Sequence, residues 1–381
     1  MSVNIYLDYA AATPLDAEVL SMMQSYFTDR FYNPSATYLA GRAVHNDVEV
    51  ARAQVAKELG VRPREIVFTA GGTEANNLAI RGVLELFPNK NIVISSVEHK
   101  SVLEPARQFD NSVVSVGADG IIDIEELGKC INSDTVLVSL MLVNNEIGTL
   151  QPVAEVAKIV SQIRSQRAKI GNKTPLYLHT DACQAPNYLS VMPHRYQVDL
   201  MTLNGGKIYG PKQTGMLYIK TGVNIQPLLL GGGQEWGARS GTENVPGIVG
   251  FSQALIKAIA MQPQEAKRVS ALQDEFIYKL NAHLKNVAIN GSTKHRIANN
   301  IHITLPGHDN ERLMMELDEL GIQCAVGSAC SASSDEPSHV LMAIGLSESD
   351  AQSSLRFTLG RSNTSADIDA VVRALTQLCS N

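Results

Sequence analysis

The 381-residue sequence contains neither a long hydrophobic run nor a basic leader. Its first residues, MSVNIYLDYAAATPLD, have no positively charged stretch followed by an apolar one, which argues against a signal peptide. No apolar run approaches the roughly 18 residues that a membrane span needs. We therefore expect no contact with a membrane.

Cysteine is sparse and odd in number, with five residues: Cys130, Cys183, Cys324, Cys330 and Cys379. This usage predicts reduced thiols in the cytoplasm rather than the disulfide framework of a secreted protein. Two of these cysteines lie six positions apart, which is not the spacing of a Cys-x-x-Cys zinc or redox motif. We expect no metal site.

Positive charge is also in short supply, with 32 Lys and Arg against 38 Asp and Glu and a net charge of −6. Without a basic tract or an interleaved basic and aromatic patch, nucleic acid is not an expected partner. The 44% hydrophobic content is enough for a sizeable core. The length predicts more than one compact unit, or one large unit with an appendage.

Strand-like runs alternate with helix-like ones along the first two thirds of the chain. An apolar face with steps of three and four predicts a helix over residues 44–59. The predicted strands are residues 65–69, 91–95, 135–143, 175–181, 198–204 and 214–220. Most gaps between them can hold a crossover helix, as residues 152–166 do. This order predicts a parallel or mixed sheet covered by helices on both faces.

The pattern changes after about residue 250. A largely helical stretch, residues 251–284, precedes shorter predicted strands in NNIHITLP and GIQCAVG and a terminal helix in ADIDAVVRALTQLC. We interpret this part as a smaller α+β domain.

A glycine pair follows the first predicted strand of the sheet, in EIVFTAGGTEANNLAI. Gly71 and Gly72 let backbone amides approach an anion, and Thr73 can cap the following helix and donate its hydroxyl to a phosphate. Taken alone, the same residues favour an ordinary strand–helix turn with a threonine cap.

Asp181 ends the strand in PLYLHTDACQ. A carboxylate at a buried strand end needs a donor, and a pyridine nitrogen held in its protonated form is one such donor. Asp181 could instead cap a following helix.

Lys207 follows a strand and a double glycine in VDLMTLNGGKIYGPK. Ile208 comes directly after this lysine, so the stretch is not a P-loop. A lysine in a desolvated pocket can form a Schiff base with a carbonyl cofactor. Most lysines are solvated surface groups, so the residue alone does not decide between these two roles.

Several longer motifs occur in one order from residue 5 to about 375. They are LDYAAATP, AGGTEANN, VEHKSVLEP, VNNEIGTLQPV, HTDACQ, KIYGPK, GGGQEWGARSGTENVPGIVG, GSACSASS and SSLRFTLGR. With them the chain resembles fold-type I enzymes that use pyridoxal 5′-phosphate (PLP), more closely the class V aminotransferase group. Within that group it is similar to cysteine desulfurases of the NifS/IscS-like type.

The resemblance implies a fold and a domain division. It implies a large PLP-binding domain, residues 15–254, with a mainly parallel seven-stranded sheet covered by helices. It also implies a small α+β domain, residues 1–14 and 255–381, which carries a catalytic-cysteine loop at about 324–339.

The resemblance also assigns roles around the cofactor ring. Lys207 matches the Schiff-base lysine, and Asp181 matches the partner of the pyridine nitrogen. Gln184 matches the side chain that binds the phenolic oxygen. His99 matches the imidazole that stacks on the ring and assists proton transfer, although a histidine alone would be read as part of the core.

Other matches concern the phosphate and the substrate. Gly72 and Thr73 match phosphate contacts. Thr242 matches a phosphate contact that the family supplies from the neighbouring subunit, which implies a homodimer. Arg356 matches the fork that binds the substrate carboxylate, a geometry that favours Arg over Lys. Asn145 matches a residue near both substrate and cofactor. Alone, Arg356 could be a surface ion pair and Asn145 a turn residue.

Two further asparagines and one glycine complete the expected site. Asn33, in YNPSA, is expected near the substrate. The family usually has Ser-Gly-His-Lys where this chain has Asn204-Gly205-Gly206-Lys207. The family histidine helps to hold the phosphate, and Gly206 has no side chain for that role. We expect Asn204 and the backbone at Gly206 to contribute instead.

Cys330, in GSACSASSDEPSH, matches the cysteine that accepts sulfur from L-cysteine. The resemblance implies a persulfide on Cys330, L-alanine as product, and transfer of sulfur to an acceptor or scaffold protein in iron–sulfur cluster assembly or thiolation. The structural alternative is an idle surface thiol. Selenocysteine lyase, a class V aminotransferase and a degenerate sulfur-relay partner remain alternative functions.

Overall fold

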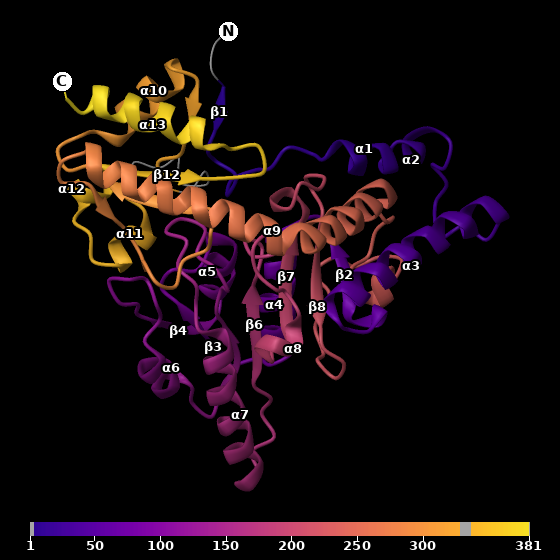
Figure 1. The fold of residues 1–381 in the computed structure, drawn as a ribbon. Coiled ribbons are helices and arrows are strands. Elements are labelled where there is room, and N and C mark those ends of the chain that lie inside the picture. Colours follow the sequence, from indigo (N-terminus) through magenta and orange to yellow (C-terminus); the bar gives the residue numbers. More distant parts are fainter. Residues whose placement is uncertain (1–3, 328–336, 381) are drawn as a thin grey trace.

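The computed structural model describes residues 4–327 and 337–380, and a seven-stranded sheet forms its centre (Figure 1). The strands are β2 (Ile66–Thr69), β3 (Asn91–Ser95), β4 (Asp110–Val114), β5 (Thr135–Ser139), β6 (Tyr177–Asp181), β7 (Leu200–Asn204) and β8 (Gly215–Ile219). Their order across the sheet is β2-β8-β7-β6-β5-β3-β4. Only β8 runs antiparallel to its neighbours. The predicted α/β class with a mainly parallel seven-stranded sheet is confirmed.

The central strands are apolar along their whole length because helices cover both faces of the sheet. Every residue of β2, β3 and β5 is buried. The helices up to the end of the sheet are α1 (Ala17–Met23), α2 (Ser25–Thr28), α3 (Leu39–Leu59), α4 (Gly72–Leu84), α5 (Lys100–Ala106), α6 (Ile124–Cys130), α7 (Val153–Lys169) and α8 (Pro193–Tyr196). Short 3₁₀ turns occupy Pro63–Glu65, Gly205–Lys207 and Glu235–Gly237.

A single long helix, α9 (Val245–His283), connects the sheet region to the C-terminal part of the chain (Figure 1). Its length and composition would suffice for a membrane span. More than half of its most apolar window is buried inside the protein, however, where α9 packs against α1, α3 and α13 (Ser365–Leu378). We therefore assign α9 as a core helix.

The C-terminal part contains a three-stranded antiparallel sheet in the order β12-β10-β9. Its elements are β9 (Ala288–Ile289), β10 (Asn300–Thr304), α10 (Asn310–Glu319), β11 (Ile322–Gln323), α11 (His339–Ala343), α12 (Glu348–Ala351) and β12 (Ser354–Thr358). β11 pairs in parallel with β1 (Ile5–Tyr6), so the N-terminal residues lie beside the C-terminal part.

The three-stranded sheet has one apolar and one polar face because side chains alternate along each strand. On the apolar face, Phe357 meets Phe276 of α9 with ring centroids 5.4 Å apart. The opposite face carries only polar side chains from β10 and β12: Asn300, His302, Thr304, Ser354, Arg356 and Thr358. All six are buried, so this polar face belongs to the interior of the protein.

Two predicted strands are shorter in the structure, and the strands β1, β4, β9 and β12 were not predicted. The strand expected in GIQCAVG is only two residues long, and the strand expected over 135–143 ends at Ser139. β4 was not predicted, because its sequence DNSVV begins with polar residues and the strand lies exposed at the edge of the sheet. The expected domain boundary, 254/255, falls inside α9.

Candidate active site

The carboxyl ends of the parallel strands meet at one edge of the sheet, and polar side chains follow each of them. Gly72 follows β2, His99 follows β3, and Asn145 follows β5, while Asp181 ends β6 and Lys207 follows β7. In open α/β sheets, ligands bind at this edge.

A cavity that is open to solvent lies among these residues. Its lining includes most of the predicted site residues: Gly72, Thr73, His99, Asn145, Asp181, Gln184, Asn204, Lys207 and Arg356. The structure therefore brings together residues that are nearly 290 positions apart in the sequence.

Lys207 ends the 3₁₀ turn after β7 and extends its amine toward the N-terminal segment. Its Nζ donates hydrogen bonds to the carbonyl oxygens of Ala10 and Ala11, at 2.7 and 2.5 Å. Gln184 Nε2 donates to the same Ala10 carbonyl at 3.0 Å. The segment LDYAAATP thus forms one wall of the cavity and holds the amine in place.

Asp181 presents a buried carboxylate to the cavity. Its two oxygens accept hydrogen bonds from Asn76 Nδ2 at 2.7 Å and from the backbone amide of Cys183 at 2.9 Å. No helix follows Asp181 directly, because the next one begins at Pro193, so the alternative role as a helix cap is wrong. Asn76 Oδ1 is buried and accepts no hydrogen bond from the described residues. An additional donor therefore fits this part of the cavity.

His99 is the N-cap residue of α5, and its ring is fixed by Ser101. His99 Nδ1 accepts a hydrogen bond from the Ser101 amide at 3.1 Å and lies 2.7 Å from Ser101 Oγ. An accepting Nδ1 leaves the proton of a neutral imidazole on Nε2. Ser101 also lines the cavity.

Glu98, which precedes His99, is fully buried beneath the same turn. Burial raises the pKa of its carboxyl well above the ordinary value, and the nearby Asp181 charge adds to that shift. Its Oε1 accepts a hydrogen bond from the Met141 amide at 2.7 Å. A neutral Glu98 thus joins the turn after β3 to the turn after β5.

The N-terminus of α4 points its unpaired amides at the cavity. The helix begins at Gly72 and its N-cap is Gly71, whose φ of 132° requires glycine. The prediction that Thr73 caps this helix is therefore wrong, since Thr73 lies in its first turn. A Cβ on Gly72 would meet Cys183 Sγ at 2.9 Å, which explains the second glycine.

The substituted turn before Lys207 has its own hydrogen bond. Asn204 Oδ1 accepts the Gly206 amide at 2.9 Å, so that amide is already used within the turn. Asn204 lines the cavity, whereas Gly206 does not. The side chain that the turn offers to a ligand is therefore that of Asn204.

Arg356 reaches the cavity from the polar face of the three-stranded sheet and is 1% exposed. It donates to Asp8 Oδ1 at 2.7 Å and to the carbonyl oxygen of Asn145 at 3.1 Å. These two contacts fix the guanidinium between the N-terminal segment and the turn after β5.

Cys330 lies outside the described residues, but both flanks of its segment contact the walls of the site. Before it, Ala325 and Arg356 exchange two backbone hydrogen bonds, at 3.1 and 2.8 Å. After it, Ser338 Oγ donates to the Glu146 carboxylate, and His339 Nε2 donates to the Glu98 carbonyl at 3.0 Å.

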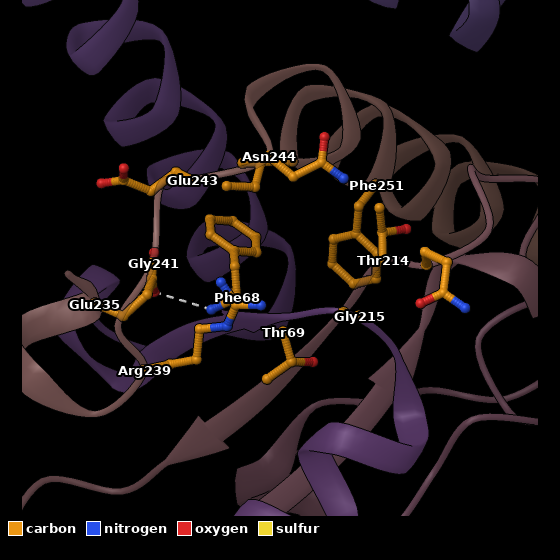
Figure 2. A pocket seen from close by; sticks show the side chains of 13 residues that line it. Phe68, Thr69, Thr214, Gly215, Glu235, Arg239, Gly241, Glu243, Asn244 and Phe251 are labelled. Carbon is orange, nitrogen blue, oxygen red and sulfur yellow. Dashed lines mark hydrogen bonds between the residues drawn. The ribbon is translucent and has the colours of Figure 1, made fainter. Parts of the chain in front are cut away.

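Asn33 and Thr242 are exposed and do not line this cavity. The neighbours of Thr242, Gly241 and Glu243, instead line a second pocket together with Phe68 and Thr69 of β2 (Figure 2). The structure of one chain therefore does not bring either residue to Lys207.

Sequence reasoning missed several residues that shape the cavity. They are Ala10, Ala11, Asn76, Ser101, Met141, Val143 and Cys183. Asn76 lies one helical turn after Thr73, so helix geometry offered a signal for it. The two alanines act through backbone carbonyls, which residue type does not reveal.

Comparison with known proteins gives one consistent family. The model of the family Aminotransferase class-V matches residues 5–371. A relative described as cysteine desulfurase IscS, from Dictyoglomus turgidum, is 39% identical over 385 residues, which cover 99% of this chain and 95% of the relative.

Two solved structures agree with this comparison. One, described as a NifS-like protein, has a TM-score of 0.90 at 32% identity, covering 99% of this chain and 100% of the other. Another, described as SspA in complex with cysteine, has a TM-score of 0.81 at 34% identity, covering 93% and 99%.

Proposed function

Because the chain belongs to the class-V aminotransferase family, we propose that it is a cysteine desulfurase. It takes sulfur from L-cysteine, releases L-alanine and passes the sulfur to an acceptor protein. The observation that carries this proposal is the cavity where Lys207, Asp181, His99 and Arg356 converge, in a chain similar over nearly its whole length to relatives described as cysteine desulfurases.

The cavity fits PLP by the chemistry of its donors. The amides of the α4 N-terminus, Thr73 and the side chain of Asn204 suit a phosphate. Asp181 and the unpaired Asn76 Oδ1 suit a protonated ring nitrogen. Gln184 suits the phenolic oxygen, and the Lys207 amine suits the aldehyde. When bound, PLP supplies an electron sink for the carbanion at the substrate's α-carbon.

The chain's own residues bind the substrate and move its proton. Arg356 binds the α-carboxylate as a planar fork, for which its contacts with Asp8 and Asn145 orient it. Lys207 Nζ takes up the α-proton and returns it. His99, held by Ser101 with a proton on Nε2, serves as a second proton carrier beside the ring.

The sulfur transfer needs a thiolate, for which we propose Cys330. The C–S bond of L-cysteine breaks as an S–S bond forms on Cys330, and a proton takes the place of sulfur on carbon. One thiol and one L-cysteine thus become one persulfide and one L-alanine, without an external oxidant. The flanks of the Cys330 segment support this role because they contact Arg356, Glu146 and Glu98.

We also propose a homodimer, in which Thr242 of one copy completes the phosphate site of the other. Exposed large apolar side chains support this assembly. They lie around α2, the start of α3 and the segment before Thr242: Phe27, Phe31, Tyr38, Leu39, Leu229, Leu230 and Trp236. Asn33, which we propose lies near the substrate, is in the same region.

The proposal includes a domain division and a compartment. The large domain comprises residues 15–254, and the small one residues 1–14 and 255–381, with support from the pairing of β1 with β11.

Four free cysteines among the described residues support a reducing, cytoplasmic setting, where the acceptor serves iron–sulfur cluster assembly or thiolation.

The test is a pair of measurements on purified protein. The wild type with PLP should show the absorbance of a lysine-bound cofactor and form L-alanine from L-cysteine, whereas Lys207→Ala should lose both. An unchanged spectrum in Lys207→Ala would contradict the cofactor assignment. Formation of pyridoxamine phosphate and a keto acid would indicate an aminotransferase, and a strong preference for selenocysteine would indicate selenocysteine lyase.

A further inference from the structure

The polar face of the three-stranded sheet places His302 directly beside Arg356. The two residues are opposite each other in the antiparallel register of β10 and β12, so their side chains lie on the same face. His302 is fully buried and Arg356 is 1% exposed. His302 belongs to none of the motifs that carry the family resemblance.

A chain of hydrogen bonds determines which group donates at each step near this histidine. Ser354 Oγ lies 2.7 Å from the Asp350 carbonyl, which can only accept, so Ser354 donates there. Ser354 Oγ therefore accepts from Thr304 Oγ1, 2.7 Å away. Thr304 Oγ1 in turn accepts from Asn290 Nδ2, at 2.8 Å. This order fixes the orientation of the Asn290 amide.

The fixed amide determines the tautomer of His302. Asn290 Nδ2 lies 2.9 Å from His302 Nδ1 and donates to it, so Nδ1 carries the lone pair. Burial, together with the nearby charges of Arg356 and Arg296, lowers the pKa of His302 to about 3, so the ring is neutral. The proton of a neutral ring with an accepting Nδ1 is on Nε2.

His302 Nε2 is therefore a buried N–H donor, and no described residue accepts from it. Arg356 Nε is a second buried donor without an acceptor among the described residues. The other fully buried histidine, His179, differs, because Ser139 Oγ and Thr202 Oγ1 bind its two ring nitrogens at 2.8 and 3.1 Å. The unpaired nitrogen is thus a property of the His302 site and not of buried histidines in this protein.

The local charge favours an anion at these two donors. Arg296 is half-buried, and its hydrogen bonds go to neutral oxygens: the carbonyls of Ser292, Asn300 and Asn290, and the Asn300 side chain. Arg356 has one acidic partner, Asp8. His302 therefore lies near two guanidinium groups, those of Arg356 and Arg296, and only Arg356 has a carboxylate partner among the described residues.

We propose that His302 is a second binding residue for the substrate's α-carboxylate, which accepts from Nε2 of His302 as well as from the Arg356 guanidinium. Arg356 lines the cavity, and His302 lies beside it on the same face of the sheet without lining the cavity, so the acceptor we assign to Nε2 is an oxygen of a carboxylate held by Arg356. This inference rests on the proposed function, in which Arg356 binds the carboxylate.

The test compares two ligands that differ only in the carboxylate, L-alanine and ethylamine. Each is titrated into PLP-loaded protein while the cofactor absorbance is followed. His302→Leu removes the donor, and His302→Gln keeps an N–H at a similar reach. We expect His302→Leu to weaken L-alanine binding about tenfold or more. Ethylamine binding should change less than about twofold, and His302→Gln should stay close to wild type.

His308→Leu, in the turn after β10, is the matched control and should match the wild type with both ligands. If His302→Leu weakened the binding of L-alanine and of ethylamine equally, His302 would have only a structural role and the proposal would be overturned. Unchanged L-alanine binding would also overturn it.

A second measurement does not depend on the loaded enzyme. Nitrogen-15 NMR of the imidazoles in cofactor-free protein should show the His302 proton on Nε2, and a proton on Nδ1 would overturn the inference. The wild type could show no change in cofactor absorbance with L-alanine while NMR still places the proton of His302 on Nε2. That result would contradict the proposed function and leave the tautomer of His302 as assigned.

Discussion

Two buried histidines give the folded state a dependence on pH. Burial lowers the pKa of His179 to about 4 and that of His302 to about 3, from an ordinary value of 6.5. Below pH 6.5 the unfolded chain binds protons at these positions that the folded protein does not. The free energy of unfolding therefore falls as the pH decreases from 6.5 toward these values. Glu98 has the opposite sign, since its raised pKa favours the folded state at low pH.

The contribution of His302 can be isolated by comparing the wild type with His302→Gln. The variant lacks the titrating ring, so its stability does not depend on the protonation of residue 302. We subtract the free energy of unfolding of His302→Gln from that of the wild type. We expect this difference to decrease by about 1 kcal/mol when the pH is lowered from 6 to 5. Urea unfolding at the two pH values measures it. A constant difference between the two proteins would contradict the lowered pKa.

Single residues show where sequence reasoning works and where it stops. Lys207 and Asp181 were singled out by their positions at strand ends, their roles were assigned from the family resemblance, and both line the cavity. His302 was not, because its segment NNIHITLP was predicted only as a short strand. Its special position depends on a cross-strand partner 54 residues later and on the orientation of Asn290, which no local pattern contains.

At the scale of elements, a buried ion pair fixes the segment that carries Thr242. Arg52 of α3 binds Glu235 through two hydrogen bonds, at 2.7 and 2.8 Å, and both side chains are almost fully buried. The Arg52 guanidinium lies 4.7 Å from the Phe68 ring and 4.5 Å from the Trp236 ring. Glu235 also accepts the Phe68 amide at 2.9 Å, so the segment is tied to both α3 and β2.

Removing one partner of this pair leaves a buried charge uncompensated. We expect Arg52→Met to lower the free energy of unfolding by about 3–5 kcal/mol. The control is Arg81→Met, which breaks an exposed ion pair with Glu85 on α4 and should change stability by less than about 1 kcal/mol. Urea unfolding measures the free energy of unfolding of both variants. An equal loss of stability in the two would contradict a special stabilising role for the buried Arg52–Glu235 pair.

The predicted strands agree with the structure where the whole strand is buried, and the prediction fails for strands at the edges of the sheets. The strands β3, β6 and β7 lie inside the runs predicted for them because both faces of the sheet are covered. The edge strand β4 has a solvent-exposed side and therefore lacks an apolar signature. The length of β11 depends on its pairing with β1, more than 300 residues away, which propensity does not encode.

At the scale of the whole molecule, the proposed dimer explains apolar surface that one chain leaves exposed. Leu39 is 78% exposed and Leu230 is 81% exposed, in segments far apart in the sequence. Exposed apolar clusters of this kind mark protein interfaces. If Thr242 acts across that interface, dissociation should weaken the cofactor site as well.

We expect Leu230→Glu to shift the protein toward monomers and to lower its affinity for PLP. Ile170→Glu is the matched control, because Ile170 is 79% exposed directly after the end of α7 and its substitution should leave both properties unchanged. Sedimentation gives the mass, and a spectral titration gives the affinity. A Leu230→Glu protein that sediments as the wild type does would argue against this surface.

The central claim is that sulfur leaves L-cysteine for Cys330 as L-alanine forms. The direct test is a single turnover of the PLP-loaded wild type and of Cys330→Ser with L-cysteine, followed by quantification of L-alanine and mass analysis of the peptide that contains residue 330. The account predicts one L-alanine per wild-type chain, with one added sulfur atom on Cys330. It predicts neither in Cys330→Ser, which keeps the cofactor absorbance. Wild-type yields of L-alanine from Cys330→Ser would contradict it.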